Sequence, residues 1–255
     1  MSVTNRTKYQ GVTNIIRFNW HFYVLAIVAV LAFFLIKPYL PFLLQQIGIW
    51  AIAVAVLTIV ISLAISFYIY DRSGLYRLSW LDNDLTNDRA RILTVNAGFD
   101  ETSALIAAKY PKAQITICDF YNPVHHTEVS IKRARKAYPP DPGTIPVNTN
   151  HLPFPDNHFD KTVAVLSAHE IRNEAERIAF FKELKRVTTP SGHIYVTEHL
   201  RDRYNFFAYT IGFLHFHAKK TWLNTFAGAG LVVQQEIKTT PFITTFILQA
   251  HGNTL

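Results

Sequence analysis

The first 70 residues of the chain contain no aspartate or glutamate, and two long uncharged apolar stretches occupy most of them. The first stretch covers 18–36, and the second has its apolar centre at 47–70. A helix of about 17 to 25 apolar residues is long enough to cross a hydrocarbon core about 30 Å thick. The start of this chain is therefore suited to a bilayer and poorly suited to a water-exposed fold.

The two apolar stretches are joined by the short segment Lys37-Pro38-Tyr39-Leu40-Pro41. Proline disfavours helix before it and cannot continue one, so this segment predicts a tight turn. We expect a membrane anchor at 1–70, with two transmembrane helices at about 18–36 and 45–70. The first stretch is too long for a signal peptide and lacks a small-residue cleavage site. A pair of buried helices in a soluble protein is the alternative that the sequence leaves open.

The basic residues near the apolar stretches predict how the anchor is oriented. They lie before the first stretch and after the second, and the connecting turn carries a single lysine; they are Arg6, Lys8, Arg17, Arg72, Arg77 and Lys37. Cytoplasmic ends of transmembrane helices are enriched in lysine and arginine. We therefore expect a two-span membrane protein with both termini and the globular domain in the cytoplasm.

The charge of the whole chain does not indicate a nucleic-acid-binding protein. The formal net charge is +7, but the basic residues form no dense run interleaved with aromatics and no helix-turn-helix or zinc-finger pattern. Cys118 is the single cysteine, so an intramolecular disulfide is impossible. Its place in an apolar run favours a buried side chain over a nucleophile.

From residue 91 onward, short apolar strands alternate with helical stretches. After a juxtamembrane linker at 71–90, this alternation predicts a domain at 91–255 with a doubly wound, mostly parallel sheet and an antiparallel edge. Strands are expected at 91–95, 114–118, 161–166, 193–198, 231–237 and 242–250, and helices at 100–110, 128–138, 173–187 and 218–229. Ligands bind such sheets at the carboxyl ends of the strands, so the residues that follow each strand are the site candidates.

Two of these strand ends carry residues suited to a nucleotide-like ligand. Gly98 follows the first strand, where a tight turn needs glycine for close approach to a ligand. Asp119 follows the second strand, 21 positions after Gly98, and suits hydrogen bonding to ribose hydroxyls. A nicotinamide-dependent oxidoreductase was the other nucleotide-binding class to consider, but the turn lacks its GxGxxG pattern.

Two further motifs are more specific. The segment 152–160 reads LPFPDNHFD and leads into KTVAVL, and 181–187 reads FKELKRV before Pro190-Ser191-Gly192-His193. With the preceding strand ends, these motifs resemble class I S-adenosylmethionine-dependent methyltransferases of the ubiquinone/menaquinone-type (type 11) subgroup, over about 91–250. The resemblance implies a Rossmann-like seven-stranded α/β sheet and S-adenosylmethionine as the cofactor.

The resemblance also implies which residues bind that cofactor. It places the methionine end beside the turn after the first strand, the ribose at the end of the second strand, and the adenine beyond it. The implied residues are Asn96, Ala97 and Gly98 for the methionine end, Asp119 for the ribose, Phe120, Asn148 and Thr149 for the adenine, and Ser167 beneath the sulfonium. The family usually has an acid at Thr94, glycine at Asn96 and Asp100, and aspartate at Asn148. The acids Asp100 and Glu101 can cap the next helix or attract a cationic cofactor, and both interpretations stay open.

Catalytic candidates follow the fourth and fifth strands. Methyl transfer mainly requires alignment of donor and acceptor, with a base where the acceptor loses a proton. The candidates are His169 and Glu170 after the fourth strand and Glu198 and His199 after the fifth, of which we favour His199, His169 and Glu198. No histidine lies at the HExxH spacing from His169, and neighbouring histidines would point to different faces of a helix, so no metal site is expected.

The region 201–217, which follows the fifth strand, is rich in aromatic residues and suits a lid for a lipophilic acceptor or a face that lies on the bilayer. The predicted function is methyl transfer to a lipophilic small molecule at the cytoplasmic membrane face, with the bilayer and the lipophilic substrate as partners. The alternative is a degenerate methyltransferase fold that acts as a membrane-bound binding or scaffold subunit.

Overall fold

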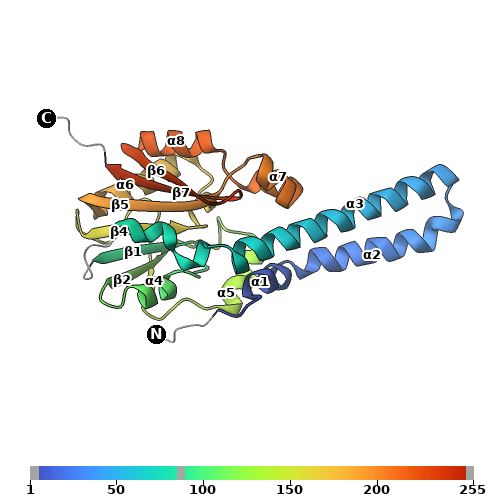
Figure 1. The fold of residues 1–255 in the computed structure, drawn as a ribbon, viewed down its shortest axis with the longest axis horizontal. Coiled ribbons are helices and arrows are strands. Elements are labelled where there is room, and N and C mark those ends of the chain that lie inside the picture. The colour runs from blue at the N-terminus through green and yellow to red at the C-terminus, as the bar shows by residue number, and fades with distance from the viewer. Residues whose placement is uncertain (1–5, 85–89, 251–255) are drawn as a thin grey trace.

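The computed structural model describes residues 6–84 and 90–250, and it shows a long helical hairpin that projects from an α/β domain (Figure 1). The N-terminal part contains α1 (Gln10–Phe18), α2 (Trp20–Ile36), the short turn Lys37–Tyr39 and α3 (Phe42–Phe67). Helices α2 and α3 are the two arms of the hairpin, and α1 lies at its base beside the domain.

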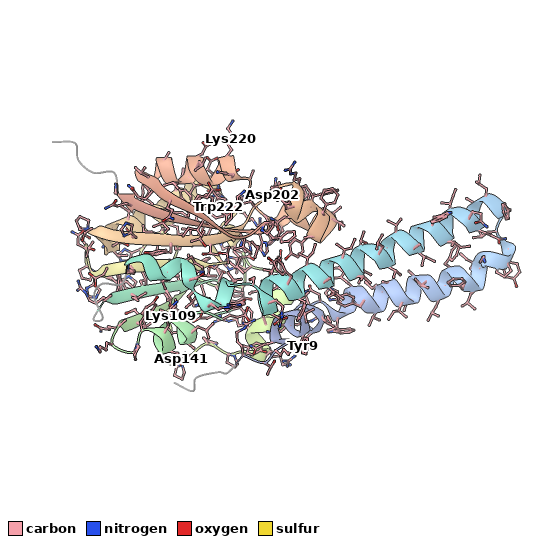
Figure 2. All side chains as sticks on the ribbon, viewed as in Figure 1. Tyr9, Lys109, Asp141, Asp202, Lys220 and Trp222 are labelled. Carbon is pink, nitrogen blue, oxygen red and sulfur yellow. The ribbon has the colours of Figure 1, made fainter. Side chains whose placement is uncertain are left out.

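The two arms are long and apolar enough to cross a membrane, over Trp20–Tyr39 and Phe42–Leu81. None of the apolar window in the first arm and 11% of that in the second is buried inside the protein. Figure 2 shows their side chains pointing outward along the whole hairpin. The rest of the described chain therefore leaves most of the surface of these two helices uncovered.

Two N-terminal features differ from the sequence expectation. Residues before the first apolar stretch form the separate helix α1, whose backbone N–H groups at Gly11 and Val12 donate to the Asp71 carboxylate at 2.6 and 2.8 Å. A negative charge at a helix N-terminus is favourable, so Asp71 fixes α1 to the base of the hairpin. The expected linker at 71–90 contributes buried residues such as Trp80 and Leu81 to the core of the α/β domain.

The sheet has seven strands in the order β3-β2-β1-β4-β5-β7-β6, with β7 antiparallel to both of its neighbours. This confirms the predicted doubly wound, mostly parallel sheet with an antiparallel edge. The strands are β1 (Arg91–Asn96), β2 (Gln114–Asp119), β3 (Ile145–Pro146), β4 (Phe159–Val165), β5 (Thr188–His199), β6 (Leu231–Thr240) and β7 (Ile243–Ala250). Strand order reverses beside β1, so β1 and β4 mark the edge where a ligand is expected.

The two faces of the sheet are covered differently. Helices α6 (Glu174–Val187) and α8 (Lys219–Gly228) pack on one face, where Phe180, Phe181 and Trp222 are buried. Helix α4 (Ser103–Lys109) and the segment that contains Trp80 cover the other face. Helix α5 (Val129–Ala137) packs against α1, and α7 (Arg203–Tyr209) packs against α3. These two helices therefore connect the hairpin to the domain.

Two elements begin at residues other than those predicted from the sequence, namely helix α4 and strand β5. Helix α4 begins at Ser103, three residues later than expected, because the Asp100 carboxylate accepts the N–H groups of Thr102 and Ser103. An acceptor at this place ends the preceding turn and caps the helix. Strand β5 starts five residues early, at Thr188, and pairs with β4 through a register shift.

Replacing Gly98 by alanine is expected to lower the stability of the domain by about 2 kcal/mol, since side chains are disfavoured at positive φ. Gly98 has φ +96°, and a Cβ there would lie 2.8 Å from the Tyr121 ring. Gly74→Ala is the matched control, because its Cβ would have its nearest neighbour at 3.6 Å. Thermal unfolding measures the stability of the two variants. Equal melting temperatures would contradict the prediction that a side chain at position 98 strains the turn.

Candidate functional site

A cavity of about 260 Å³ lies at the carboxyl ends of β1, β4 and β5. Its floor is formed by the sheet, with Asn96 and Ala97 after β1, His169 and Glu170 after β4, and His199 at the end of β5. Its other walls come from α1, α5 and the end of the hairpin, through Asn14, Phe18, Ile131 and Tyr70. The cavity thus lies where the α/β domain meets the base of the apolar hairpin.

A second, more open cavity of about 910 Å³ lies at the ends of β2 and β3. It is lined by Asp119, Phe120, Asn148 and Thr149, the residues implied for the ribose and adenine. The implied methionine-end residues Asn96 and Ala97 line the first cavity instead. The structure therefore divides the sequence-implied cofactor residues between two neighbouring cavities.

The turn after β1 is held by Asn96, at a position where the family usually has glycine. The Asn96 side chain donates to Cys118 O at 3.1 Å and accepts the N–H of Gly98 at 3.0 Å. These two bonds fix the turn from within, so this asparagine supports the tight turn and leaves its backbone beside the cavity. The Tyr121 ring packs against Gly98 and separates the turn from the second cavity.

The other departures near this turn are also explained by local contacts. Thr94, where the family usually has an acid, shares a hydrogen bond of 2.6 Å with Ser103. Glu101 accepts hydrogen bonds from Arg6 and from the Tyr76 hydroxyl, each at 2.6 Å. Asp100 thus stabilises the start of α4, as described above. Glu101 connects the segment before α1, through Arg6, and the segment after the hairpin, through Tyr76, to the α/β domain.

Asp119 is buried at the end of β2, and α5 covers it. Its carboxylate forms an ion pair with Arg135 of α5 and accepts the N–H of Tyr121 at 2.8 Å. A ribose that binds Asp119 must compete with Arg135 for the same oxygen atoms. Arg135 of α5 therefore holds the carboxylate that lines the second cavity.

Replacing Arg135 by glutamine is expected to strengthen binding of S-adenosylhomocysteine by about three- to tenfold. A partly exposed ion pair contributes up to about 1 kcal/mol, which the ligand no longer has to displace. Titration calorimetry of the variant and of Lys136→Gln, the exposed neighbour on α5, measures the difference. Weaker binding by Arg135→Gln would show instead that this guanidinium contacts the ligand.

The residues implied for the adenine all contact other residues at the rim of the second cavity. Phe120 packs its ring against His126 and Phe180, with centroid separations of 5.9 and 5.3 Å. The Thr149 hydroxyl donates to Glu176 at 2.6 Å, and Asn148 pairs with His151 in a short bridge. These residues form an ordered rim around the second cavity.

Ser167 was expected beneath the sulfonium, but its hydroxyl is buried and donates to Val95 O at 3.1 Å. It links the ends of β4 and β1 and does not line either cavity. The preceding residue, Leu166, has φ +49°, a conformation that is strained for leucine. This turn directs the following short helix, Ala168–Glu170, toward the first cavity.

Glu198 orients His169, and it does so from a fully buried position. Its carboxylate oxygens accept the His169 backbone N–H at 3.2 Å and the Nδ1–H at 2.6 Å. Burial opposes a charge on His169, but the Glu198 and Glu170 carboxylates outweigh it and raise the pKa of His169 to about 10. Glu198 is therefore a positioning residue for His169.

His199 has the opposite electrostatic environment. Its Nδ1–H faces two acceptors at 3.1 Å, Asn205 Oδ1 and Phe242 O, which leaves Nε2 to accept from the Tyr70 hydroxyl at 2.8 Å. Burial lowers the pKa of His199 to about 3, against the opposing effect of the hydrogen bond that His199 donates to Asn205. His199 is therefore neutral, and with Tyr70 it forms a polar pair at the cavity wall that sequence analysis had missed.

Because the pKa of His199 is lowered in the folded protein, the free energy of unfolding is expected to depend on pH below about 6.5. An unfolded histidine titrates near 6.5, so as the pH falls from 6.5 toward 3 the unfolded chain binds a proton that the folded chain does not. We expect stability to fall over this window, and His199→Gln to reduce the slope by up to about 1.4 kcal/mol per pH unit. Denaturant unfolding at pH 6.5 and 5 measures the slope, and identical slopes would contradict a buried neutral His199.

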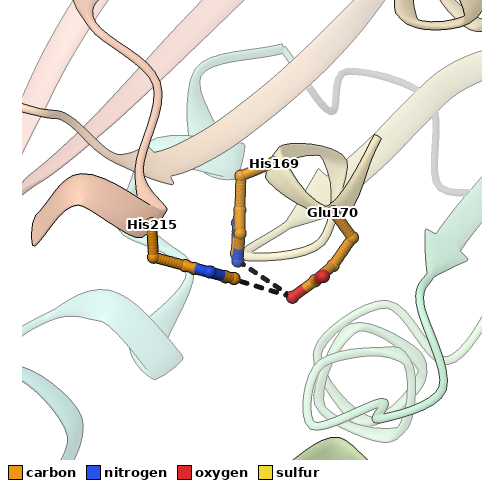
Figure 3. Close-up of side chains that lie close together, drawn as sticks. All are labelled: His169, Glu170 and His215. Atoms are coloured by element: carbon orange, nitrogen blue, oxygen red, sulfur yellow. Dashed lines mark hydrogen bonds and ion pairs between the residues drawn. The ribbon is translucent and has the colours of Figure 1, made fainter. Parts of the chain in front are cut away.

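A third histidine, His215, joins His169 and Glu170 from 45 positions farther along the chain. Its Nε2 lies 3.3 Å from Glu170 Oε1 and its Nδ1 2.9 Å from Glu128 Oε1. Figure 3 shows both imidazole rings directed at the Glu170 carboxylate. The prediction of no metal site considered only histidines close to one another along the chain. This grouping was missed because His215 is 45 positions away from Glu170.

The order of the strands, with the antiparallel seventh strand inserted next to β5, is that of the class I methyltransferase fold. Residues 93–196 match the family Methyltransf_11, described as a methyltransferase domain. The matched segment runs from β1 through most of β5 and contains the turn at Gly98, Asp119, the LPFPDNHFD segment and His169.

Two of the solved structures with a similar fold are described as S-adenosylmethionine-dependent methyltransferases. An S-adenosylmethionine-dependent methyltransferase from Aquifex aeolicus is 15% identical, with 62% of this chain and 81% of that chain covered and a TM-score of 0.45. Another from Methanosarcina mazei is 17% identical, with 64% and 93% covered and a TM-score of 0.47. No curated protein sequence matches the chain. At these identities and TM-scores the likeness carries no argument about ligand or substrate.

Proposed function

We propose that this protein is an S-adenosylmethionine-dependent methyltransferase that acts on a lipophilic small molecule at the cytoplasmic membrane face. The observation that carries the proposal is the 260 Å³ cavity at the strand ends of a methyltransferase fold, walled on its other side by the base of an apolar hairpin. Such a position gives one compartment access both to a water-soluble cofactor and to a molecule dissolved in the bilayer.

The residues present fit the cofactor, provided that α5 releases Asp119. Asp119 lines the second cavity with the residues implied for the adenine, and the residues Asn96 and Ala97, implied for the methionine end, line the first. Displacing Arg135 and turning the Tyr121 ring would join the cavities at the point where the ribose is expected. When bound, the cofactor supplies an activated methyl group on a sulfonium; the chain's own residues position it and shape the acceptor site.

Several features support action at a membrane. The described chain covers little of the hairpin. At its base, α7 and the short helix that follows it, Thr210–His215, expose the apolar side chains Phe206, Phe207, Ile211 and Leu214. Large exposed apolar surfaces in one region mark sites that meet a membrane or a partner. With the basic residues that flank the hairpin, this surface favours a bilayer around α2 and α3 and its interface at α1 and α7.

A membrane-bound binding or scaffold subunit is the second candidate. The Asp119–Arg135 ion pair favours it, because this pair occupies the carboxylate on which ribose binding depends. The first cavity favours catalysis, because it reaches both His169 and His199. The two candidates therefore differ in one measurable property, the affinity for the cofactor.

The methyltransferase and scaffold candidates can be distinguished by titration calorimetry. The full-length protein in detergent is titrated with S-adenosylmethionine and with S-adenosylhomocysteine. The enzyme proposal predicts micromolar binding of both ligands at one site per chain. A folded protein that binds neither ligand, in both the wild type and Arg135→Gln, would leave only the scaffold candidate. Circular dichroism on the same samples verifies the fold.

A further inference from the structure

We propose that His169, Glu170 and His215 bind a divalent transition-metal ion, such as Zn²⁺ or Mn²⁺, that holds the hydroxyl group of the acceptor. One ligand atom from each residue lies within 4.8 Å of the other two, and all three residues line the first cavity. The inference rests on the proposed function for the role of the metal, but the metal site itself depends only on these side chains.

Two of the three distances between the ligand atoms match a metal coordination shell, and all three ligand atoms lie within 4.8 Å of one another. Glu170 Oε1 lies 3.4 Å from His169 Nε2 and 3.3 Å from His215 Nε2. Ligands about 2.1 Å from a tetrahedral metal ion are separated by roughly 3.4 Å along each edge. The two rings are nearly perpendicular, with centroids 5.0 Å apart, so both can direct a nitrogen lone pair to one point (Figure 3).

The outer contacts of both histidines are those expected of metal ligands. A metal-binding histidine commonly donates its other ring N–H to a carboxylate, which fixes the ring and the tautomer. Glu198 occupies Nδ1 of His169 at 2.6 Å, and Glu128 occupies Nδ1 of His215 at 2.9 Å. Both Nε2 atoms are thereby directed at Glu170. The combination of two histidines, one carboxylate and open positions suits zinc, manganese or ferrous iron.

The charge balance of the cluster also favours a cation. Three carboxylates, those of Glu128, Glu170 and Glu198, surround the two imidazoles. Arg172 is the only guanidinium at the cluster among the described residues, and its Nη2 lies 3.0 Å from His215 Nε2. This exposed side chain is the group that an arriving metal ion would displace. With both histidines neutral and Arg172 displaced, these groups carry a net charge of −3, which a divalent ion reduces to −1.

The position of the cluster indicates what the metal ion would do. It lines the first cavity, together with Asn96 and with residues at the base of the hairpin. With three protein ligands, a metal ion keeps at least one position for water or for an acceptor oxygen and lowers the pKa of the bound group. The acceptor class is therefore a lipophilic molecule with a hydroxyl group, and the metal orients that oxygen within the cavity.

Metal binding to the full-length, chelator-treated protein in detergent tests the inference. We expect one equivalent of Zn²⁺ by calorimetry, and an absorption band of tetrahedral Co²⁺ when cobalt is used as the probe. Glu170→Gln and His215→Ala should weaken Zn²⁺ binding at least about 100-fold, and Glu128→Gln by about tenfold. His125→Ala, an exposed histidine at the other cavity, should leave binding unchanged.

Absence of stoichiometric binding in the wild type would overturn the inference, and so would unchanged affinity in Glu170→Gln, which keeps the side-chain shape. Cofactor titrations of the same preparations separate the two proposals. If the wild type binds Zn²⁺ and the variants do not, the metal site is supported whether or not S-adenosylhomocysteine binds. Failure of S-adenosylhomocysteine to bind would count only against the methyltransferase function. Cofactor binding without Zn²⁺ binding would overturn only the metal site.

Discussion

Asp119→Ala is expected to weaken binding of S-adenosylhomocysteine by about 10- to 100-fold. A hydrogen bond to a charged acceptor contributes about 1.5 to 3 kcal/mol, and the ribose would lose its carboxylate partner. The side chain is buried at the end of β2, where it lines the second cavity. Titration calorimetry of the folded variant measures the loss directly.

The variant also removes the partner of Arg135, so a control for stability is needed. Asp119→Ala/Arg135→Gln removes both members of the pair and should bind the ligand as weakly as the single variant. Asp141→Ala, an exposed acid in the loop after α5, should bind like the wild type. Unchanged affinity in Asp119→Ala would place the ribose elsewhere and contradict the division of the site between the two cavities.

His169→Ala is expected to destabilise the domain by about 3 to 5 kcal/mol, because it leaves the Glu198 carboxylate buried without its charged partner. Glu198 is fully buried, and His169 supplies both of the contacts described for its two oxygens. For a domain of this size the melting temperature should fall by roughly 6 to 20 °C. Thermal unfolding in the presence of a chelator measures the effect without a contribution from bound metal.

A double-mutant cycle separates the ion pair from the loss of packing. His169→Ala/Glu198→Gln removes the buried charge as well, so it should recover part of the lost stability. His125→Ala, on the exposed rim of the second cavity, should change the melting temperature by less than about 2 °C. Equal melting temperatures for the single and double variants would contradict a buried charged pair.

The fold was predictable from sequence because its determinants are local. Strand β1 is an apolar run buried on both faces, and Pro111 and Pro139 follow the helices that they end. Strand β3 was not predicted from the sequence, because Ile145–Pro146 has only two residues and shows no periodicity. Helix α1 was also missed, because the basic residues around it were interpreted only as flanks of a transmembrane helix.

The site was predictable only where chemistry follows a strand directly. Asn96, His169 and His199 were found this way, and the structure places all three on one cavity. Contacts between distant segments had no sequence signal: His215 reaches Glu170 across 45 positions, and Tyr70 reaches His199 across 129. The Asp119–Arg135 pair was missed for a related reason, since nothing in the α5 sequence shows that this helix turns away from the sheet toward α1.

Transfer of a labelled methyl group tests the central claim most directly. The full-length protein in lipid nanodiscs is incubated with S-adenosylmethionine labelled in the methyl group and with a bacterial lipid extract. The organic-soluble products are then counted. We predict label in a lipophilic product, reduced at least about tenfold by Asp119→Ala. No label in the organic phase, from protein that binds the cofactor and with the extract in excess, would contradict a lipophilic acceptor and with it the proposed function.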